Sequence, residues 1–137
     1  MILGHCSLKK YIADGKLILK PVSEDSIREA GIDLRLYSHL ELEPHTFKLA
    51  WTKEWIELPV ELIGFCNLRS TFARMGISIP PTIVDPGFKG QLVIEVINMG
   101  DKPVELKEGD RFLHLILAKC EDASLYSGRY QGQKPNS

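Results

Sequence analysis

The sequence predicts a mainly β fold in which short strands form a sandwich or a barrel, preceded by one short helix. Short apolar runs recur along the chain, and residues typical of turns separate them. No alternation of strands and helices appears, so a parallel sheet of the Rossmann type is excluded. With 137 residues, of which 44% are hydrophobic, the chain can bury one core. We therefore expect residues 1–137 to form one domain.

The individual elements follow from hydrophobic periodicity and turn chemistry. Ser7 is a typical capping residue, and the apolar residues after it share one face of a short helix that ends near Gly15. Residues 126–137 form a polar, glycine-containing tail, which either frays or becomes ordered over a ligand. The predicted strands are residues 17–19, 32–36, 55–58, 62–68, 77–79, 92–97, 104–106 and 112–118.

Charge and cysteine usage exclude several classes of protein. Lysine and arginine number 17 against 18 acidic residues, so no broad field exists for holding a nucleic acid or an anionic membrane. The three cysteines are widely separated and show no paired spacing, which argues against a disulfide framework and a cysteine-rich zinc site. No apolar stretch approaches the roughly 20 residues of a membrane span. We expect a soluble, cytoplasmic protein with reduced thiols.

A carboxylate in the strand of residues 91–98 is the first candidate for chemistry. Both faces of this strand are apolar, as in an interior strand. Glu95 points the same way as Val93 and Ile97, where an ionised carboxylate loses hydration and needs a partner or a proton. A carboxyl group with a raised pKa is what a general base near neutrality requires. The alternative is a Glu95 that is paired with an arginine at a sheet edge or subunit seam and has no chemical role.

The second candidate for a functional site is an anion-binding turn, which the sequence of residues 69–76 predicts. Ser70 can cap a single helical turn that ends at Gly76. Free backbone N–H groups there, with the hydroxyls of Ser70 and Thr71 and the guanidinium groups of Arg69 and Arg74, would suit phosphate. The alternative is a capped surface turn with solvated arginines.

A stiff hairpin at residues 80–90 is the third candidate. Two prolines precede Asp85, and a turn of Asp85, Pro86 and Gly87 follows. An ordinary loop would also accept these residues. A functional role for the hairpin is favoured because, in the sequence, it lies between the predicted anion turn and Glu95.

Together these segments resemble, in order and spacing, the core of the dCTP deaminase family, a branch of the dUTPase superfamily. The similarity covers most of the chain, and the ordered set of motifs is more specific than any one of them. The segments are Ala30-Gly31-Ile32-Asp33-Leu34-Arg35, Leu68-Arg69-Ser70-Thr71-Phe72-Ala73-Arg74, Val84-Asp85-Pro86-Gly87-Phe88-Lys89-Gly90, Val93-Ile94-Glu95, Glu108-Gly109-Asp110-Arg111 and Gly128-Arg129-Tyr130-Gln131-Gly132-Gln133.

The resemblance implies a homotrimer of distorted β-barrel or jelly-roll subunits of the dUTPase-like type, with active sites shared between neighbouring chains. It implies that Glu95 is the base that activates water for attack at C4 of cytosine, without zinc. Ser70 and Arg74 would position base, water and carboxylate. Mg²⁺ would enter bound mainly through the triphosphate, because phosphate oxygens are its usual ligands, and no metal ion would be held by protein ligands alone.

Substrate contacts are also implied by the resemblance. Arg69 and Thr71 would face the phosphates. Val84 and Phe88 would contact the substrate, with Phe88 beneath the deoxyribose. Asp85 matches the aspartate that orients the water attacking the α-phosphate in dUTPases. The closing tail would contribute Arg129, Tyr130 and Gln133.

Two departures from the family pattern leave alternatives open. Residues 78–81, Ser-Ile-Pro-Pro, stand where deaminases usually carry His-x-Thr-Ala, and the glycine-rich last motif of ordinary dUTPases is missing. The first hypothesis is deamination of dCTP, which could be combined with diphosphate release to give dUMP. The second is hydrolysis of dUTP to dUMP and diphosphate without deamination. The third is a nucleotide-binding protein that has kept the pocket and lost the chemistry.

Overall fold

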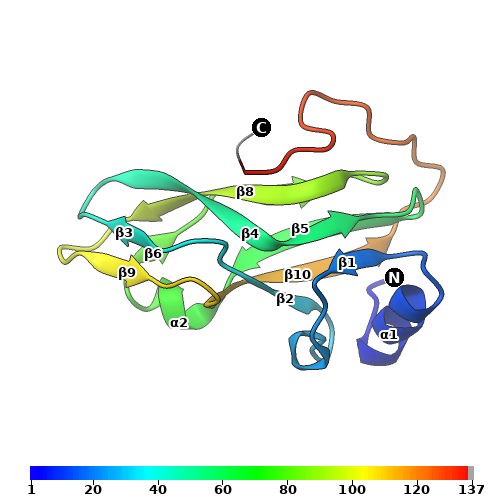
Figure 1. Cartoon of the computed structure of the whole chain (residues 1–137), viewed down its shortest axis with the longest axis horizontal. Helices are drawn as coiled ribbons and strands as arrows, with labels where there is room; N and C mark the ends of the chain where they lie inside the picture. The colour runs from blue at the N-terminus through cyan, green and yellow to red at the C-terminus, as the bar shows by residue number, and fades with distance from the viewer. Residues whose placement is uncertain (136–137) are drawn as a thin grey trace.

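The computed structural model describes residues 1–135 and confirms a mainly β fold (Figure 1). Two four-stranded sheets and one two-stranded sheet contain all the strands of this part of the chain. In chain order the elements are α1 (His5–Ala13), β1 (Ile18–Lys20), the 3-10 turn η1 (Glu24–Ser26), β2 (Ile32–Arg35), β3 (Leu40–Leu42), β4 (Phe47–Glu57), β5 (Leu62–Leu68), α2 (Ser70–Ala73), β6 (Ile77–Ser78), β7 (Thr82–Val84), β8 (Lys89–Asn98), β9 (Val104–Leu106) and β10 (Arg111–Lys119).

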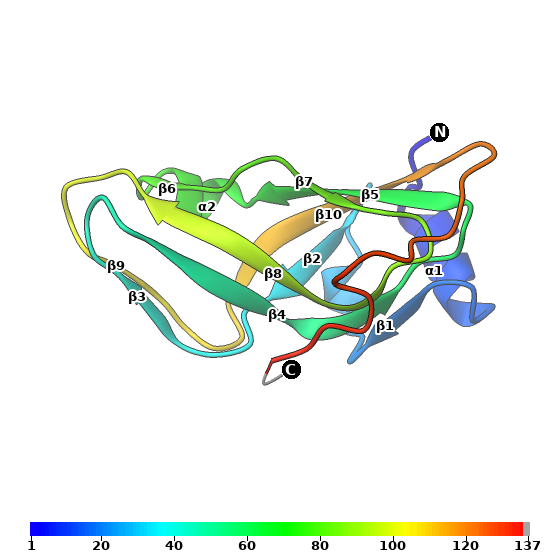
Figure 2. The same ribbon diagram turned by 90° about the horizontal axis from the view of Figure 1, so that it is seen from above.

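The two larger sheets pack their inner faces together around one core. The first has the order β1-β4-β8-β6 and the second β2-β10-β5-β7, and every neighbouring pair is antiparallel. Strands alternate inward and outward side chains, and the inward ones are fully buried, such as Ile94 of β8 and Leu115 of β10. The sheets do not close into a barrel, so the architecture is that of a jelly-roll-like sandwich (Figure 2).

Both predicted caps are wrong. The helix α1 begins at His5, and Gly4 occupies its N-cap in an extended conformation, so Ser7 lies inside the first turn. Ser70 likewise is the first residue of α2, with Arg69 at the N-cap and no side-chain capping bond at either helix. The helix α2 ends at Ala73, with Arg74 at its C-cap, so it is shorter than the predicted turn to Gly76. A non-helical turn follows it and includes Gly76, whose φ of 93° favours glycine.

The observed strands agree best with the predicted ones where the hydrophobic pattern of the sequence was unambiguous. The strands β5 and β9 have the predicted bounds. The strand β3 was not predicted, and β4 begins at Phe47, well before the predicted start at Trp55. The missed half of β4 carries large apolar side chains on its exposed face, so its pattern lacks the alternation of apolar and polar residues typical of a half-buried strand.

Each large sheet exposes an apolar patch on its outer face. Cα partners in an antiparallel pair present their side chains on the same side. Five such residues form the β4–β8 patch, and three form the β5–β7 patch, each with exposed or half-buried side chains. The β4–β8 patch is Phe47, Leu49, Trp51, Val93 and Ile97, and the β5–β7 patch is Phe65, Ile83 and Ile116. Contiguous exposed apolar surface of this kind usually marks a contact with another molecule.

Among residues 1–135, no helix has both the length and the apolar character needed to cross a membrane.

Candidate active site

The predicted site residues fall into two groups at opposite ends of β8. At one end, Ile77 follows the turn of α2 and pairs with Asn98, the last residue of β8. At the other end, the β7–β8 hairpin carries Asp85 and Phe88 directly before Lys89, where β8 begins. The ten residues of β8 span about 30 Å at the usual rise of a strand, and Figure 2 shows α2 and the hairpin separated in this way. One chain therefore does not bring the two groups together.

The α2 end presents polar groups on a rigid turn. The buried Phe72 anchors this single turn, while Ser70, Thr71 and Arg74 are exposed. The backbone N–H of Arg69 donates to the carbonyl oxygen of Phe112 at 2.8 Å, which ties the start of the turn to β10. The predicted hydroxyl and guanidinium groups are thus available to a ligand.

A pocket of about 420 Å³ lies beside this turn and contains two residues to which the sequence analysis gave no role. Asp33 is 2% exposed, its Oδ1 lies 3.1 Å from Nδ1 of His114, and its Oδ2 lies 3.8 Å from Nη1 of Arg69. No hydrogen-bond partner for Oδ2 exists among the described residues. A sequence signal for Asp33 existed, because this carboxylate stands between the apolar Ile32 and Leu34. The residues that line the pocket are Arg28, Glu29, Ala30, Asp33, Asn67, Leu68, Arg69, Ser70 and His114.

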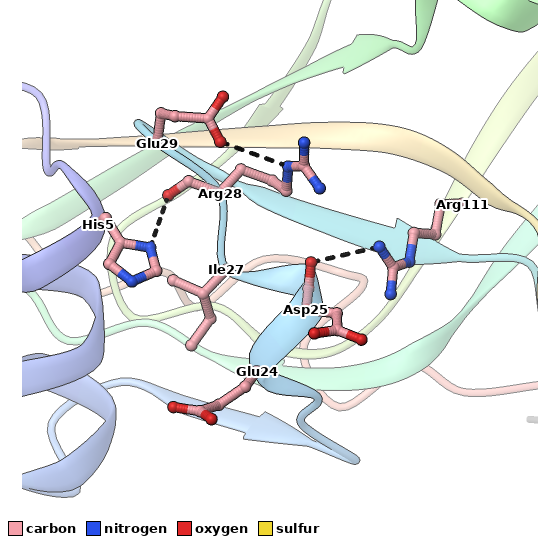
Figure 3. Close-up of a pocket in the computed structure, with 7 residues that line it drawn as sticks. All are labelled: His5, Glu24, Asp25, Ile27, Arg28, Glu29 and Arg111. Carbon is pink, nitrogen blue, oxygen red and sulfur yellow. Dashed lines mark hydrogen bonds and ion pairs between the residues drawn. The ribbon is translucent and has the colours of Figure 1, made fainter.

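A second hollow, of about 480 Å³, also has Arg28 and Glu29 in its lining (Figure 3). Arg111 donates from Nη1 to the backbone oxygen of Asp25 at 3.2 Å, and Arg28 lies 3.7 Å from Glu29. The ring of His5 lies 3.2 Å from the backbone oxygen of Arg28 and closes the other side. Arg28 therefore contributes to both hollows, with Glu29 beside it.

Glu95 has the predicted direction but not the predicted burial. Its Cα partner is Leu49, and its side chain lies on the outer face with Val93 and Ile97. Glu95 is exposed, because no other element of residues 1–135 covers the β4–β8 patch, and the expectation of a desolvated carboxylate is wrong for the single chain. Within these residues no hydrogen bond or ion pair joins Glu95 to Ser70 or Arg74. Only another surface laid on the patch would remove the carboxylate from water.

In the hairpin, Asp85 is exposed, but Val84 and Phe88 are buried. Phe88 is 5% exposed, and the ring of Tyr126 lies against it with a centroid distance of 5.8 Å. Stacking of Phe88 beneath a sugar therefore requires the covering side chains to move.

The C-terminal segment folds back onto the hairpin of its own chain. Gln133 accepts from the N–H of Gln91 at 2.9 Å and donates from its amide to the Gln91 carbonyl oxygen at 2.9 Å. A Cβ at Gly90 would lie 2.8 Å from the Gln133 carbonyl oxygen, so this approach depends on a glycine. Arg129 and Tyr130 are exposed. Residues 136 and 137 of the predicted closing segment lie outside the described residues.

One group of possible metal ligands occurs among residues 1–135. His39, Glu41 and Glu105 are exposed on and beside the β3–β9 sheet, with their ligand atoms within 4.8 Å of one another. None of the three is a predicted site residue.

Residues 37–120 match the protein family described as dCTP deaminase-like. The chain belongs to the dCTP deaminase-like family. This membership confirms the resemblance on which the predicted site residues rest, and it agrees with the jelly-roll-like sheets.

Two relatives within the family extend over nearly the whole chain. A dCTP deaminase of Pyrobaculum islandicum is 42% identical over 98% of this chain and 93% of the relative. A probable deoxyuridine 5'-triphosphate nucleotidohydrolase of Sulfolobus islandicus rod-shaped virus 1 is 48% identical over 98% of this chain and 95% of the relative. The family therefore places the chain in deoxypyrimidine nucleotide metabolism.

Two solved structures share the fold. A 2'-deoxycytidine 5'-triphosphate deaminase of Agrobacterium tumefaciens aligns with a TM-score of 0.73 and 18% identity, over 85% of this chain and 48% of that one, so the present chain spans about half its length. A mutant dUTPase of phage phi11 of S. aureus, described with a structural Mg(II) ion, aligns with a TM-score of 0.67 and 18% identity, over 82% of this chain and 96% of that one. At this identity the likeness shows the fold alone.

Proposed function

We propose that this chain is an enzyme that deaminates dCTP to dUTP in the cytoplasm, with Glu95 as the base. The observation that carries the proposal is the Glu95 carboxylate, which has no hydrogen-bond or ion-pair partner among residues 1–135 and lies within an exposed apolar patch of a dCTP deaminase-like chain. In the reaction, water adds to C4 of cytosine while Glu95 takes one of its protons. Glu95 then gives the proton to the amino group, which leaves as ammonia when the C4–N bond breaks, while the second proton of the water passes from the new hydroxyl to N3 and a carbonyl remains at C4. Bifunctional release of diphosphate, giving dUMP, belongs to the same proposal.

A homotrimer with shared sites would give Glu95 the surroundings that a base needs. The β4–β8 and β5–β7 patches are different surfaces, so contact between one patch and the other on the next subunit is heterologous and can close into a ring. Ile116 of the β5–β7 patch and His114 of the 420 Å³ pocket lie on the same side of β10. Such a contact would bring Glu95 towards the α2 end of the neighbouring subunit and remove it from water.

The remaining predicted site residues would contact different parts of the nucleotide. Ser70 and Arg74 would hold the base, the water and the catalytic carboxylate, while Arg69 and Thr71 would hold phosphate. Val84, Phe88 and Asp85 of the hairpin would contact the deoxyribose side, with Asp85 orienting water in any attack at the α-phosphate. The tail, as the segment 126–137 of a single domain, would close the site with Arg129, Tyr130 and Gln133.

Mg²⁺ would be bound mainly through the triphosphate, and zinc has no part in the proposed chemistry. Phosphate oxygens suit Mg²⁺, which keeps several waters and takes few ligands from the protein. The solved phage dUTPase of the same fold is described with a structural Mg(II) ion, which is in agreement with this choice of metal.

A second candidate function is dUTP hydrolysis without deamination. It is favoured by the viral relative named as a probable deoxyuridine 5'-triphosphate nucleotidohydrolase, which is 48% identical. The exposed Asp85 is available for orienting a water, and that reaction does not need Glu95.

The test is to incubate the parent and Glu95→Gln with dCTP and dUTP separately and to measure ammonia and diphosphate. Loss of a general base should lower the deamination rate about 10²- to 10⁴-fold, and diphosphate release from dUTP should change little. Glu41→Gln, an exposed strand glutamate on β3, is the matched control and should behave as the parent.

Each other outcome decides between the hypotheses. Diphosphate from dUTP with no ammonia from dCTP in the parent would establish the second candidate. Unchanged deamination by Glu95→Gln would remove Glu95 from the mechanism. If the parent binds a nucleotide but turns over neither, the chain is a nucleotide-binding protein.

A further inference from the structure

His114 occupies a constrained position at the polar end of the second sheet. In the register of β10 it is the Cα partner of Asp33 on β2 and of Asn67 on β5, so these three side chains lie on one face. A Cβ at Gly31 would lie 2.4 Å from Nε2 of His114, so the glycine leaves room for the imidazole ring. The ring is thus held between two strands with its Nδ1 towards Asp33.

The buried Asp33 depends on that ring. A carboxylate can only accept hydrogen bonds, so His114 donates from Nδ1 to Oδ1 at 3.1 Å. Oδ2 is buried without a hydrogen bond among the described residues, and Arg69 lies 3.8 Å from it, close enough for an ion pair but too far for a hydrogen bond. Buried polar atoms without partners are rare and call for an explanation. Here the free oxygen faces the guanidinium group of the predicted phosphate-binding arginine.

We propose that His114 is a positioning residue of the anion-binding end of the site, which holds Asp33 and through it Arg69, and whose protonation strengthens binding of the phosphate chain. The proposal rests on the proposed function for the identity of the ligand as a deoxypyrimidine triphosphate. The pocket itself requires only a polyanion.

The charges around the ring support a dependence on pH. Asp33 and Arg69 form one ion pair at the pocket, and Arg28 and Glu29, 3.7 Å apart, form another. These four groups cancel, so a neutral His114 leaves no net charge among them, and a protonated ring adds one positive charge. Histidine is the side chain that gains this charge between pH 8 and pH 5. Polyanion affinity should therefore rise as the pH falls, by about tenfold for one charge in a partly solvated pocket.

The first experiment measures binding of inorganic triphosphate to the full chain by titration calorimetry at pH 5.5, 6.5 and 8.0. His114→Gln retains an amide donor for Asp33 but cannot be protonated. Between pH 8.0 and pH 5.5, the affinity of this variant for triphosphate should therefore rise about tenfold less than the affinity of the parent. His39→Gln is the matched control, because His39 lies 3.8 Å from Glu105 as an exposed histidine outside the pocket. The titration of the ligand is common to all three proteins and cancels. Equal pH dependence in His114→Gln and the parent would overturn the proposal.

The second experiment uses only the parent, so it does not depend on a variant that folds. Binding and protonation are reciprocal, so saturating triphosphate should move the NMR titration midpoint of the His114 ring to higher pH. An unchanged midpoint would also overturn the proposal.

Measurement of dCTP turnover distinguishes a failure of the proposed role of His114 from a failure of the proposed function. Asp33→Asn should raise KM about tenfold and change kcat much less, since Asp33 acts through Arg69, which would hold the phosphate chain. If the parent turns over neither dCTP nor dUTP, the proposed function fails, while the triphosphate measurements still decide the role of His114.

Discussion

Two glutamates on neighbouring strands differ in what surrounds them. Glu54 of β4 lies on the inner face, is 1% exposed, and accepts from the backbone N–H and the Nε of Arg35 at 2.9 and 2.8 Å. Glu95 of β8 lies on the outer face, exposed between apolar neighbours, with no hydrogen-bond or ion-pair partner among residues 1–135. The inner carboxylate is already satisfied by its own chain. The outer one is available to a second molecule.

The difference separates a structural ion pair from a candidate for chemistry. A buried pair such as Glu54 and Arg35 stabilises the fold little compared with apolar side chains, but loss of one partner leaves an uncompensated buried charge. A carboxylate on an apolar surface costs the free chain little, since water still reaches it. It changes character only when that surface is covered.

The largest expected effect concerns the inner pair. Arg35→Met removes the guanidinium group and leaves the buried Glu54 carboxylate with a backbone N–H but no positive charge, and the free energy of unfolding should fall by about 3–5 kcal/mol, as measured by urea denaturation. Arg28→Met is the control, because the pair of Arg28 and Glu29 is largely exposed and should contribute less than about 1 kcal/mol. Equal losses in the two variants would mean that Glu54 is not isolated from water.

The sequence predicted the direction in which a strand side chain points better than it predicted the burial of that side chain. A period of two places Glu95 beside Val93 and Ile97, and the apolar faces of residues 91–98 predicted an interior strand, which β8 is, between β4 and β6. The pattern does not say whether anything covers that face. Burial was therefore expected of Glu95, although the single chain leaves it exposed.

Other parts of the site depend on pairings that no local pattern contains. Glu54 is turned inward in a segment where the register of β4 against β8 shifts between Trp51 and Trp55. The contact of Asp33 with His114 joins residues 81 positions apart. Such features are set by the strand register and by its local shift, and a single sequence carries no signal of either.

The second prediction concerns the outer patch. Phe47 is 63% exposed, and Phe47→Lys introduces a charge into the β4–β8 patch. If the patch is the subunit contact, loss of this exposed aromatic residue should weaken association by about 2–4 kcal/mol, seen as a smaller mass in light scattering. Val60→Lys, which replaces an apolar residue 40% exposed outside both patches, should leave the mass unchanged. A trimer in both variants would exclude the patch from the interface.

The smallest expected effect is a dependence of the free energy of unfolding on pH, which tests the burial of Cys66 on the inner face of its sheet. Burial raises the pKa of the Cys66 thiol from 9.0 to about 12. The unfolded chain, with the ordinary thiol pKa, releases this proton first, so the stabilisation is complete below about pH 9 and is lost as the pH rises towards 12. At pH 10 the free energy of unfolding should be lower by about 1.4 kcal/mol than at pH 8 through this thiol. Cys66→Ala, which lacks the thiol, should lose less stability than the parent over the same interval. Equal losses would mean that water reaches Cys66, and a thiol reagent at pH 8 would then label it as readily as the exposed Cys6.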